Sequence, residues 1–302
     1  MEKSEKKKYL SVGLGVGMTG IDLLMVMFFI PLIFILPLFM KMELVQLVYF
    51  ILVNVSAFFI IYRIRKRRTN EKFLPFSIPK KSILPFIIIG GIALVYGIMN
   101  PIFDFLPMPD IFAEESNYQS LVESLDNKYP FLAENMGDKY YLLIERFTEN
   151  YPLGVPTFIM MVVVAPIFEE LIYRGIILDG LLKRYSATTS ILVSSILFGI
   201  IHMNLPQVFP AIVAGIFMGW VYYRTKNLTL TILIHACMNL TGFIEGVLWN
   251  PQYESSIEFY GGLKPYIFIM IISIVVFVIC VLWLRKIFNK QDSLVKNLKI
   301  EN

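Results

Sequence analysis

Long, uninterrupted apolar segments dominate this sequence, and they restrict the chain to folds that cross a membrane repeatedly. A helix needs about 20 mostly apolar residues to cross the hydrocarbon. The 302 residues are 57% hydrophobic and 17% charged, too few charged side chains to cover a soluble domain of this length. We therefore predict an all-α integral membrane protein, a polytopic bundle of about eight transmembrane helices in a single membrane domain, 1–302. The candidate spans are 23–39, 44–62, 83–99, 156–182, 188–202, 206–223, 228–248 and 265–284.

Lysine and arginine are concentrated in every second connection between these segments. Cytoplasmic loops carry an excess of these two residue types. If the spans alternate, all of these connections fall on one side, so we predict that the N-terminus and the C-terminus are both cytoplasmic. The long acidic connection 104–152 then falls on the other side, and we predict an extracytoplasmic loop with short helices. The basic residues are Lys6, Lys7, Lys8, Arg63, Arg65, Lys66, Arg67, Arg68, Lys183, Arg184, Arg224, Lys226, Arg285, Lys286 and Lys290.

Glycines occur in two patterns that predict different things. The glycine-rich stretch 13–20, which precedes the first apolar segment, predicts a flexible linker. Gly215 and Gly219 are four residues apart within the sixth segment, so they lie on one helix face and let another helix approach closely. We predict that this second pattern serves packing inside the bundle.

Several polar side chains lie within the apolar segments, where each ionisable group costs about 2.5–3.5 kcal/mol. The fourth segment holds two adjacent glutamates and an arginine, and the only two histidines lie in the fifth and seventh segments, the second of them followed by an asparagine. At about 1.5 Å per helical residue, all lie roughly 10–20 Å from the inner ends of their spans. They can therefore meet in one layer between three helices, within a predicted core of residues 156–248. The six residues are Glu169, Glu170, Arg174, His202, His235 and Asn239.

Helical spacing separates the two glutamates. Glu170 and Arg174 are four residues apart with the acid first, so we predict an ion pair on one face. Glu169 is rotated by about 100° from Glu170 and faces elsewhere, so it stays available as a base. His235 and Asn239 are also four apart and share a face. A purely structural interpretation accounts for a lone Glu–Arg pair, but it leaves the second carboxylate, both histidines and the asparagine unexplained.

Three short motifs on successive apolar segments resemble those of a known family. Glu169-Glu170-x-x-x-Arg174, Phe198-x-x-x-His202 and His235-x-x-x-Asn239 are similar to the motifs of the CAAX-processing and bacteriocin-processing intramembrane proteases, which include the Rce1-type prenyl endopeptidases and bacterial Abi-domain proteins. The resemblance covers about residues 156–239 and implies peptide-bond hydrolysis inside the membrane. It also implies roles: Glu169 as general base, Glu170 and Arg174 fixing the site, His202 and Asn239 steadying the oxyanion, and His235 holding water or a proton.

Metal dependence stays open at this level. Glu169, His202 and His235 can supply a His₂-carboxylate set for Zn²⁺ with an open position for water. The helical His-Glu-x-x-His pattern of soluble zinc proteases is absent. The resembled family has been described both as metalloproteases and as glutamate-dependent proteases without a metal, so Zn²⁺ and no cofactor are both compatible with the sequence.

Two other functions remain compatible with buried acids and histidines. One is a membrane transporter or proton-coupled carrier, because such side chains also form proton relays. The other is a non-catalytic bacteriocin immunity protein of the same fold. For the protease, the expected partners are the lipid bilayer and a peptide or lipidated protein substrate, with no nucleic acid. The composition suits a multi-pass protein of a bacterial plasma membrane.

Overall fold

The computed structural model describes residues 10–25, 43–68, 81–105, 155–202, 205–248 and 256–300, and these residues are helical apart from short turns. The predicted all-α polytopic membrane protein is confirmed. Six helices in this part of the chain are long and apolar enough to cross a membrane. The predicted loop 104–152 lies almost wholly outside the described residues, as does most of the predicted first span, 23–39.

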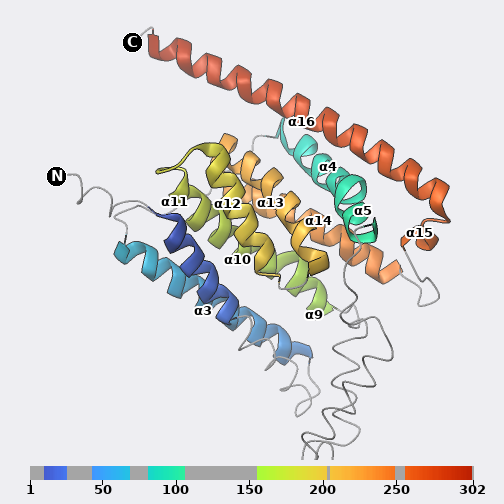
Figure 1. Cartoon of the computed structure of the whole chain (residues 1–302), viewed down its shortest axis with the longest axis horizontal. Helices are drawn as coiled ribbons and strands as arrows, with labels where there is room; N and C mark the ends of the chain where they lie inside the picture. The colour runs from blue at the N-terminus through green and yellow to red at the C-terminus, as the bar shows by residue number, and fades with distance from the viewer. Residues whose placement is uncertain are drawn as a thin grey trace, which may run out of the picture.

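The helices run side by side in three groups (Figure 1). A central group, α9 to α14, is flanked on one edge by α3 and the helix Val12–Met25, and on the other by α4, α5 and α16. The central elements are α9 (Val155–Phe158), η3 (Ile159–Val164), α10 (Ala165–Glu170), η4 (Leu171–Leu178), α11 (Asp179–Leu181), α12 (Ala187–Ile200), α13 (Leu205–Thr225) and α14 (Leu228–Leu248). The flanking elements are α3 (Glu43–Arg68), α4 (Leu84–Leu94), η2 (Val95–Met99), α5 (Asn100–Phe105), α15 (Ser256–Phe259) and α16 (Leu263–Ile300).

The glycine-rich N-terminal stretch is a helix, so the predicted flexible linker is wrong. One glycine of the helix Val12–Met25, Gly15, faces the central group, whereas a Cβ at Gly13, Gly17 or Gly20 would meet nothing within 4 Å. A Cβ at Gly15 would lie 3.6 Å from Ile177 and Leu197, and Leu10 lies so close to Gly180 that a Cβ there would approach it to 2.7 Å. The close approach of Leu10 requires a glycine at position 180. Burial of Leu10 and Met18 compensates for the low helix propensity of the glycines in the N-terminal stretch.

Cations from three connections meet at one end of the bundle, around the carboxylate of Asp179. Arg65 lies 3.4 Å, Lys183 3.1 Å and Lys226 3.5 Å from its oxygens. Arg65 also donates to the carbonyl of Gly175 at 2.8 Å. The three basic connections that were predicted to share a side of the membrane therefore do lie together. Which side is cytoplasmic stays a prediction.

The Gly215 and Gly219 face packs inside the molecule, against α12, as predicted. A Cβ at Gly215 would lie 2.9 Å from the Cβ of Ser195, and one at Gly219 would lie 3.2 Å from Ile191. The helices α12 and α13 are thus held at close range, which brings the end of α12 into the centre of the bundle.

Gly215→Ala is expected to destabilise the protein by about 1–3 kcal/mol, because the added methyl group overlaps the backbone of α12. Unfolding in detergent micelles measures the change. The matched control is Gly242→Ala on α14, where a Cβ meets nothing within 4 Å. It should leave stability unchanged or raise it by about 0.5–1 kcal/mol through helix propensity. Equal effects of the two substitutions would contradict this account of the packing.

Candidate active site

The segment that carries the two adjacent glutamates is a short α-helix between two π-helical segments. Ala165 donates its N–H to the carbonyl of Met160, five residues back. In this π-helical pattern the carbonyl of Met161 should accept from the N–H of residue 166. Residue 166 is a proline and has no N–H to donate. The amide of Asn239 takes this position, with Nδ2 donating to the Met161 carbonyl at 2.8 Å. Pro166 thus leaves the carbonyl of Met161 free to accept from Asn239, and this hydrogen bond anchors α14 to the segment that precedes the two glutamates.

Glu170 and Arg174 form the predicted ion pair. Arg174 Nη1 lies 2.7 Å from Glu170 Oε1, and both side chains are almost completely buried. Arg174 also donates to the carbonyl of Gly215 at 3.4 Å, and its guanidinium lies 4.4 Å from the centre of the Phe198 ring. The pair therefore joins η4 to α12 and α13, and it compensates for the charge that each member brings into the bundle.

His235 lies between the two glutamates. Its Nδ1 is 3.1 Å from Glu170 Oε1, and its Nε2 is 3.7 Å from Glu169 Oε2. Since Glu170 Oε1 already accepts from Arg174, it is an acceptor, and His235 Nδ1 must carry the proton of this hydrogen bond. In neutral His235 the second nitrogen, Nε2, is then a bare acceptor directed toward Glu169.

Phe198 packs edge-on against both histidine rings. The ring centres lie 5.1 Å from His202 and 5.6 Å from His235. His202 Nδ1 lies 2.9 Å from the carbonyl of Phe198, which can only accept, so this nitrogen carries a proton as well. His202 lies two residues after the end of α12, whose 14 residues extend for about 21 Å, less than the hydrocarbon thickness of about 30 Å.

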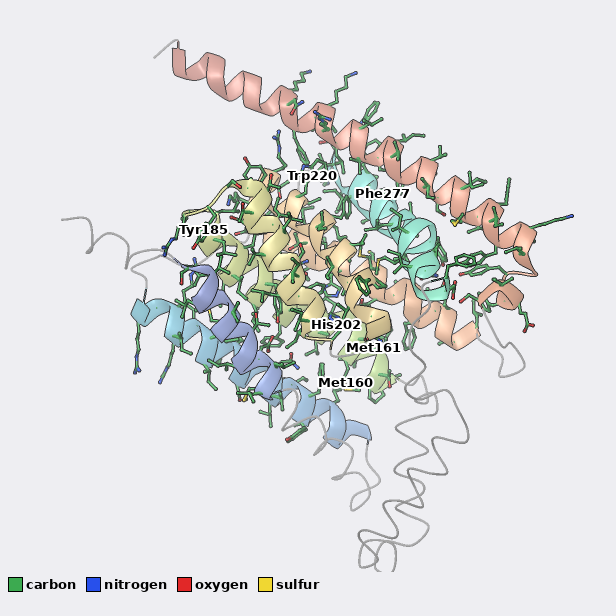
Figure 2. All side chains as sticks on the ribbon, viewed as in Figure 1. Met160, Met161, Tyr185, His202, Trp220 and Phe277 are labelled. Carbon is green, nitrogen blue, oxygen red and sulfur yellow. The ribbon has the colours of Figure 1, made fainter. Side chains whose placement is uncertain are left out.

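A cavity of about 300 Å³ lies where α12, α13 and α14 meet η2 and η3. Figure 2 shows His202 and Met161 close together at one end of the central group, with Tyr185 at the opposite end. Most of the cavity wall is apolar, and it includes Phe198 and three methionines, Met99, Met161 and Met238. Its polar lining residues are Asn100, His202, Gln207, His235 and Asn239.

The structure thus brings most of the predicted residues together. His202, His235 and Asn239 line one cavity. Glu170 bonds His235 at Nδ1, and Arg174 bonds Glu170 in turn. Glu169 is not among the lining residues; it reaches this group through His235, and its side chain is 25% exposed. The predicted single layer therefore has two parts, a cavity with amide and imidazole groups and an adjoining carboxylate.

The N-terminal half of the chain contributes a carboxylate that the motifs do not include. Asp22, on the helix Val12–Met25, is buried and accepts a hydrogen bond from Tyr173 at 3.2 Å. It lies close enough to Glu169 for the two carboxylates to interact electrostatically. The sequence feature that could have indicated Asp22 is a lone acidic residue at the edge of an apolar segment. Asp22 falls one residue before the first predicted span, which is why that signal was missed.

The residues considered for a metal do not form a metal-binding group. Among the described residues, no three His, Cys, Asp or Glu side chains are placed to share an ion. The protonated Nδ1 of His235 is directed at Glu170, and that of His202 at a backbone carbonyl. The set Glu169, His202 and His235 therefore does not fit Zn²⁺ in this arrangement.

The fold and this site define a polytopic α-helical membrane protein with acid, histidine and amide side chains gathered inside its bundle. Residues 151–241 match the family model described as type II CAAX prenyl endopeptidase Rce1-like. The resemblance that the three motifs predict is therefore confirmed for this segment, which contains Glu169, Glu170, Arg174, His202, His235 and Asn239.

Two bacterial proteins are similar to this chain over segments of 77 and 81 residues. "Putative membrane peptidase YdiL" of Bacillus subtilis is 35% identical over 77 residues, which are 26% of this chain and 32% of the relative. "UPF0177 protein YxdF" of Lactococcus lactis is 27% identical over 81 residues, 26% of this chain and 44% of the relative. The similarity thus spans less than half of either relative. No solved structure shows a significant match to the chain.

Proposed function

We propose that this chain is an intramembrane endopeptidase of the CAAX type, which hydrolyses a peptide bond in a membrane-associated or lipidated peptide. The single observation that carries the proposal is the position of His235, held by Glu170 at one nitrogen and facing Glu169 with the other, at the wall of the cavity. The family match and the named membrane peptidase among the relatives support the same reaction class.

In the proposed mechanism, water is held and activated by Glu169 with the help of His235. The distance of 3.7 Å between Glu169 Oε2 and His235 Nε2 exceeds that of a direct hydrogen bond, and both atoms are acceptors when His235 is neutral. A water molecule that donates to both directs its lone pairs away from them. As its oxygen attacks the peptide carbonyl carbon, Glu169 takes one proton and later passes it to the leaving amine nitrogen as the C–N bond breaks.

His202 and Asn239 are proposed to stabilise the oxyanion of the tetrahedral intermediate. Asn239 uses one N–H on the carbonyl of Met161, which fixes the amide and leaves its second N–H to donate. His202 Nδ1–H is engaged with Phe198, so its Nε2 can donate to an oxyanion only when the ring is an imidazolium. Donors of this kind act strongly where water is scarce.

The substrate and the location are proposals of the same kind. The cavity lies within a bundle of apolar helices, so a peptide reaches it from the membrane rather than from free solution. A lipidated or membrane-anchored chain meets that condition. Both named relatives are bacterial, and we propose the bacterial plasma membrane as the location.

The test is hydrolysis by the full chain reconstituted in vesicles that also contain a library of membrane-anchored peptides. The reaction is run in oxygen-18 water, and mass spectrometry identifies the products. Each new C-terminal carboxyl group is expected to carry one oxygen atom from the solvent, because hydrolysis adds water across the bond. Glu169→Gln is the blank, and Glu258→Gln on α15, an exposed carboxylate outside the site, is the matched control.

The same vesicles distinguish the two other functions. A proton-coupled carrier gives solute or proton flux without new peptide termini, and the flux is lost in Glu169→Gln. An immunity protein of this fold protects a host cell against a peptide toxin, and the protection persists in Glu169→Gln. Either result, with no cleavage by the wild-type chain, would overturn the protease proposal.

A further inference from the structure

A cluster of polar side chains around the carboxylate of Glu245 lies outside the segment that matches the family model. Asn100, the first residue of α5, directs its Nδ2 at both oxygens of Glu245, at 3.3 Å and 3.4 Å. Tyr260, after α15, donates its hydroxyl to Glu245 Oε1. All three residues are beyond the matched segment 151–241, so the family motifs do not account for them.

The contact with Glu245 sets the direction of the Asn100 amide. A carboxylate only accepts hydrogen bonds, so the NH₂ group must face Glu245, and the carbonyl oxygen Oδ1 must face away from it. Asn100 also lines the cavity that holds His202, His235 and Asn239. The oriented amide therefore presents its acceptor oxygen away from Glu245, on a residue that lines the cavity. Without Glu245, either end of the amide can face the cavity.

The backbone around Asn100 holds it in this position. The π-helical segment η2 ends at Met99, Pro101 follows Asn100, and a Cβ at Gly97 would lie 2.9 Å from the backbone nitrogen of Ile274 on α16. The helix is thus pressed against α16, and it widens where Asn100 faces the cavity. Single-turn π-helical segments of this kind are frequent at functional sites.

We propose that Asn100 is a substrate-binding residue whose Oδ1 accepts a main-chain N–H of the peptide, and that Glu245 is the positioning residue that orients it. An acceptor in a largely apolar cavity selects a ligand with a donor. A peptide has one at each non-proline residue, whereas a prenyl or acyl chain has none. The cavity thus holds the peptide part of the substrate next to the bond that is cut. This inference rests on the proposed endopeptidase function.

Steady-state cleavage of a peptide from the library tests the pair. Asn100→Leu removes the acceptor, and Glu245→Gln allows the amide to turn round, because glutamine both donates and accepts. Each variant is expected to raise KM about tenfold, as for one lost hydrogen bond, with kcat changed less than threefold. Asn100→Gln, which keeps the carbonyl, should recover part of the loss.

The matched control is Asp104→Asn in the neighbouring cluster. Asp104 lies on the same helix and accepts from Tyr266 and Ser256, but no hydrogen bond joins it to Asn100. The substitution removes the same charge as Glu245→Gln. If the clusters serve only to hold α16, both variants shift the unfolding midpoint and neither changes KM selectively. Equal KM values for Glu245→Gln, Asp104→Asn and the wild type would overturn the proposal.

Binding without cleavage separates this inference from the proposed function. The probe is an N-acetylated tripeptide amide with a central photoactivatable leucine, cross-linked to the Glu169→Gln chain in vesicles. Labelling near Met99 and Met161 is expected to fall about tenfold on adding Asn100→Leu. If that loss occurs while the wild type cleaves no peptide, the binding role holds and the endopeptidase proposal fails. If labelling is unchanged by Asn100→Leu, the binding role fails, whatever the wild type cleaves.

Discussion

Glu169→Gln is expected to lower the rate of peptide cleavage by a factor of about 10²–10⁴, the range attributed to a general base. Glutamine keeps the size of the side chain and removes the group that accepts the proton from water. The fold should persist, since in the described part of the chain the side chain of Glu169 makes no hydrogen bond, and its one ionic contact is the 3.7 Å approach to His235. Single-turnover cleavage in vesicles measures the rate, and the unfolding midpoint confirms that the variant is folded.

Two further substitutions test whether Glu169, Glu170 and Glu258 have the different roles that the structure suggests. Glu258→Gln should cleave at the wild-type rate. Glu170→Gln should lower the unfolding midpoint as well as the rate, because Glu170 is completely buried and bonded to both Arg174 and His235. Wild-type cleavage by Glu169→Gln would exclude Glu169 as the base.

Arg174→Leu is expected to destabilise the protein by about 3–5 kcal/mol, because it leaves the carboxylate of Glu170 buried without its cation. It also removes the contact with the Phe198 ring and the hydrogen bond to Gly215. Unfolding in detergent micelles measures the loss. Replacing both members, Glu170→Leu with Arg174→Leu, should recover much of the stability, since an apolar pair needs no charge compensation.

The double variant is nevertheless expected to remain inactive, because His235 then has no partner at Nδ1. The control is Arg184→Leu, which removes an exposed arginine three residues beyond α11 and should change stability by less than about 0.5 kcal/mol. An Arg174→Leu protein as stable as the wild type, or a double variant no more stable than the single one, would contradict the role given to this pair.

Contacts within one helix were the easiest part of the site to predict. The Glu170–Arg174 pair follows from a spacing of four residues. The same spacing predicted that Gly215 and Gly219 form a packing face, but not that α12 packs on it. For contacts between helices, the sequence predicted only that the polar residues lie at a similar depth in the membrane. The result that His235 lies between two carboxylates depends on how α14 is rotated against α10, and no spacing along one helix specifies that.

Residues outside the motifs could not be placed from the sequence. Asp22 and Asn100 lie at the edges of apolar segments, and Glu245 lies near the end of one, where a polar residue is also compatible with the membrane surface. Asp22 pairs with Tyr173, 151 positions away, and Asn100 pairs with Glu245, 145 positions away. The glycine-rich stretch 13–20 was predicted as a linker because its helix packs on residues far along the chain, with Gly15 facing Ile177 and Leu197.

Hydrophobicity and charge along the chain were sufficient to establish that it is helical and crosses a membrane several times, because each span must satisfy its own backbone hydrogen bonds in lipid. Which polar groups share a cavity, which of them carry protons, and that the proposed metal ligands do not converge came from the folded arrangement. These properties depend on the rotation and close approach of neighbouring helices, which side chains from several separate segments determine together.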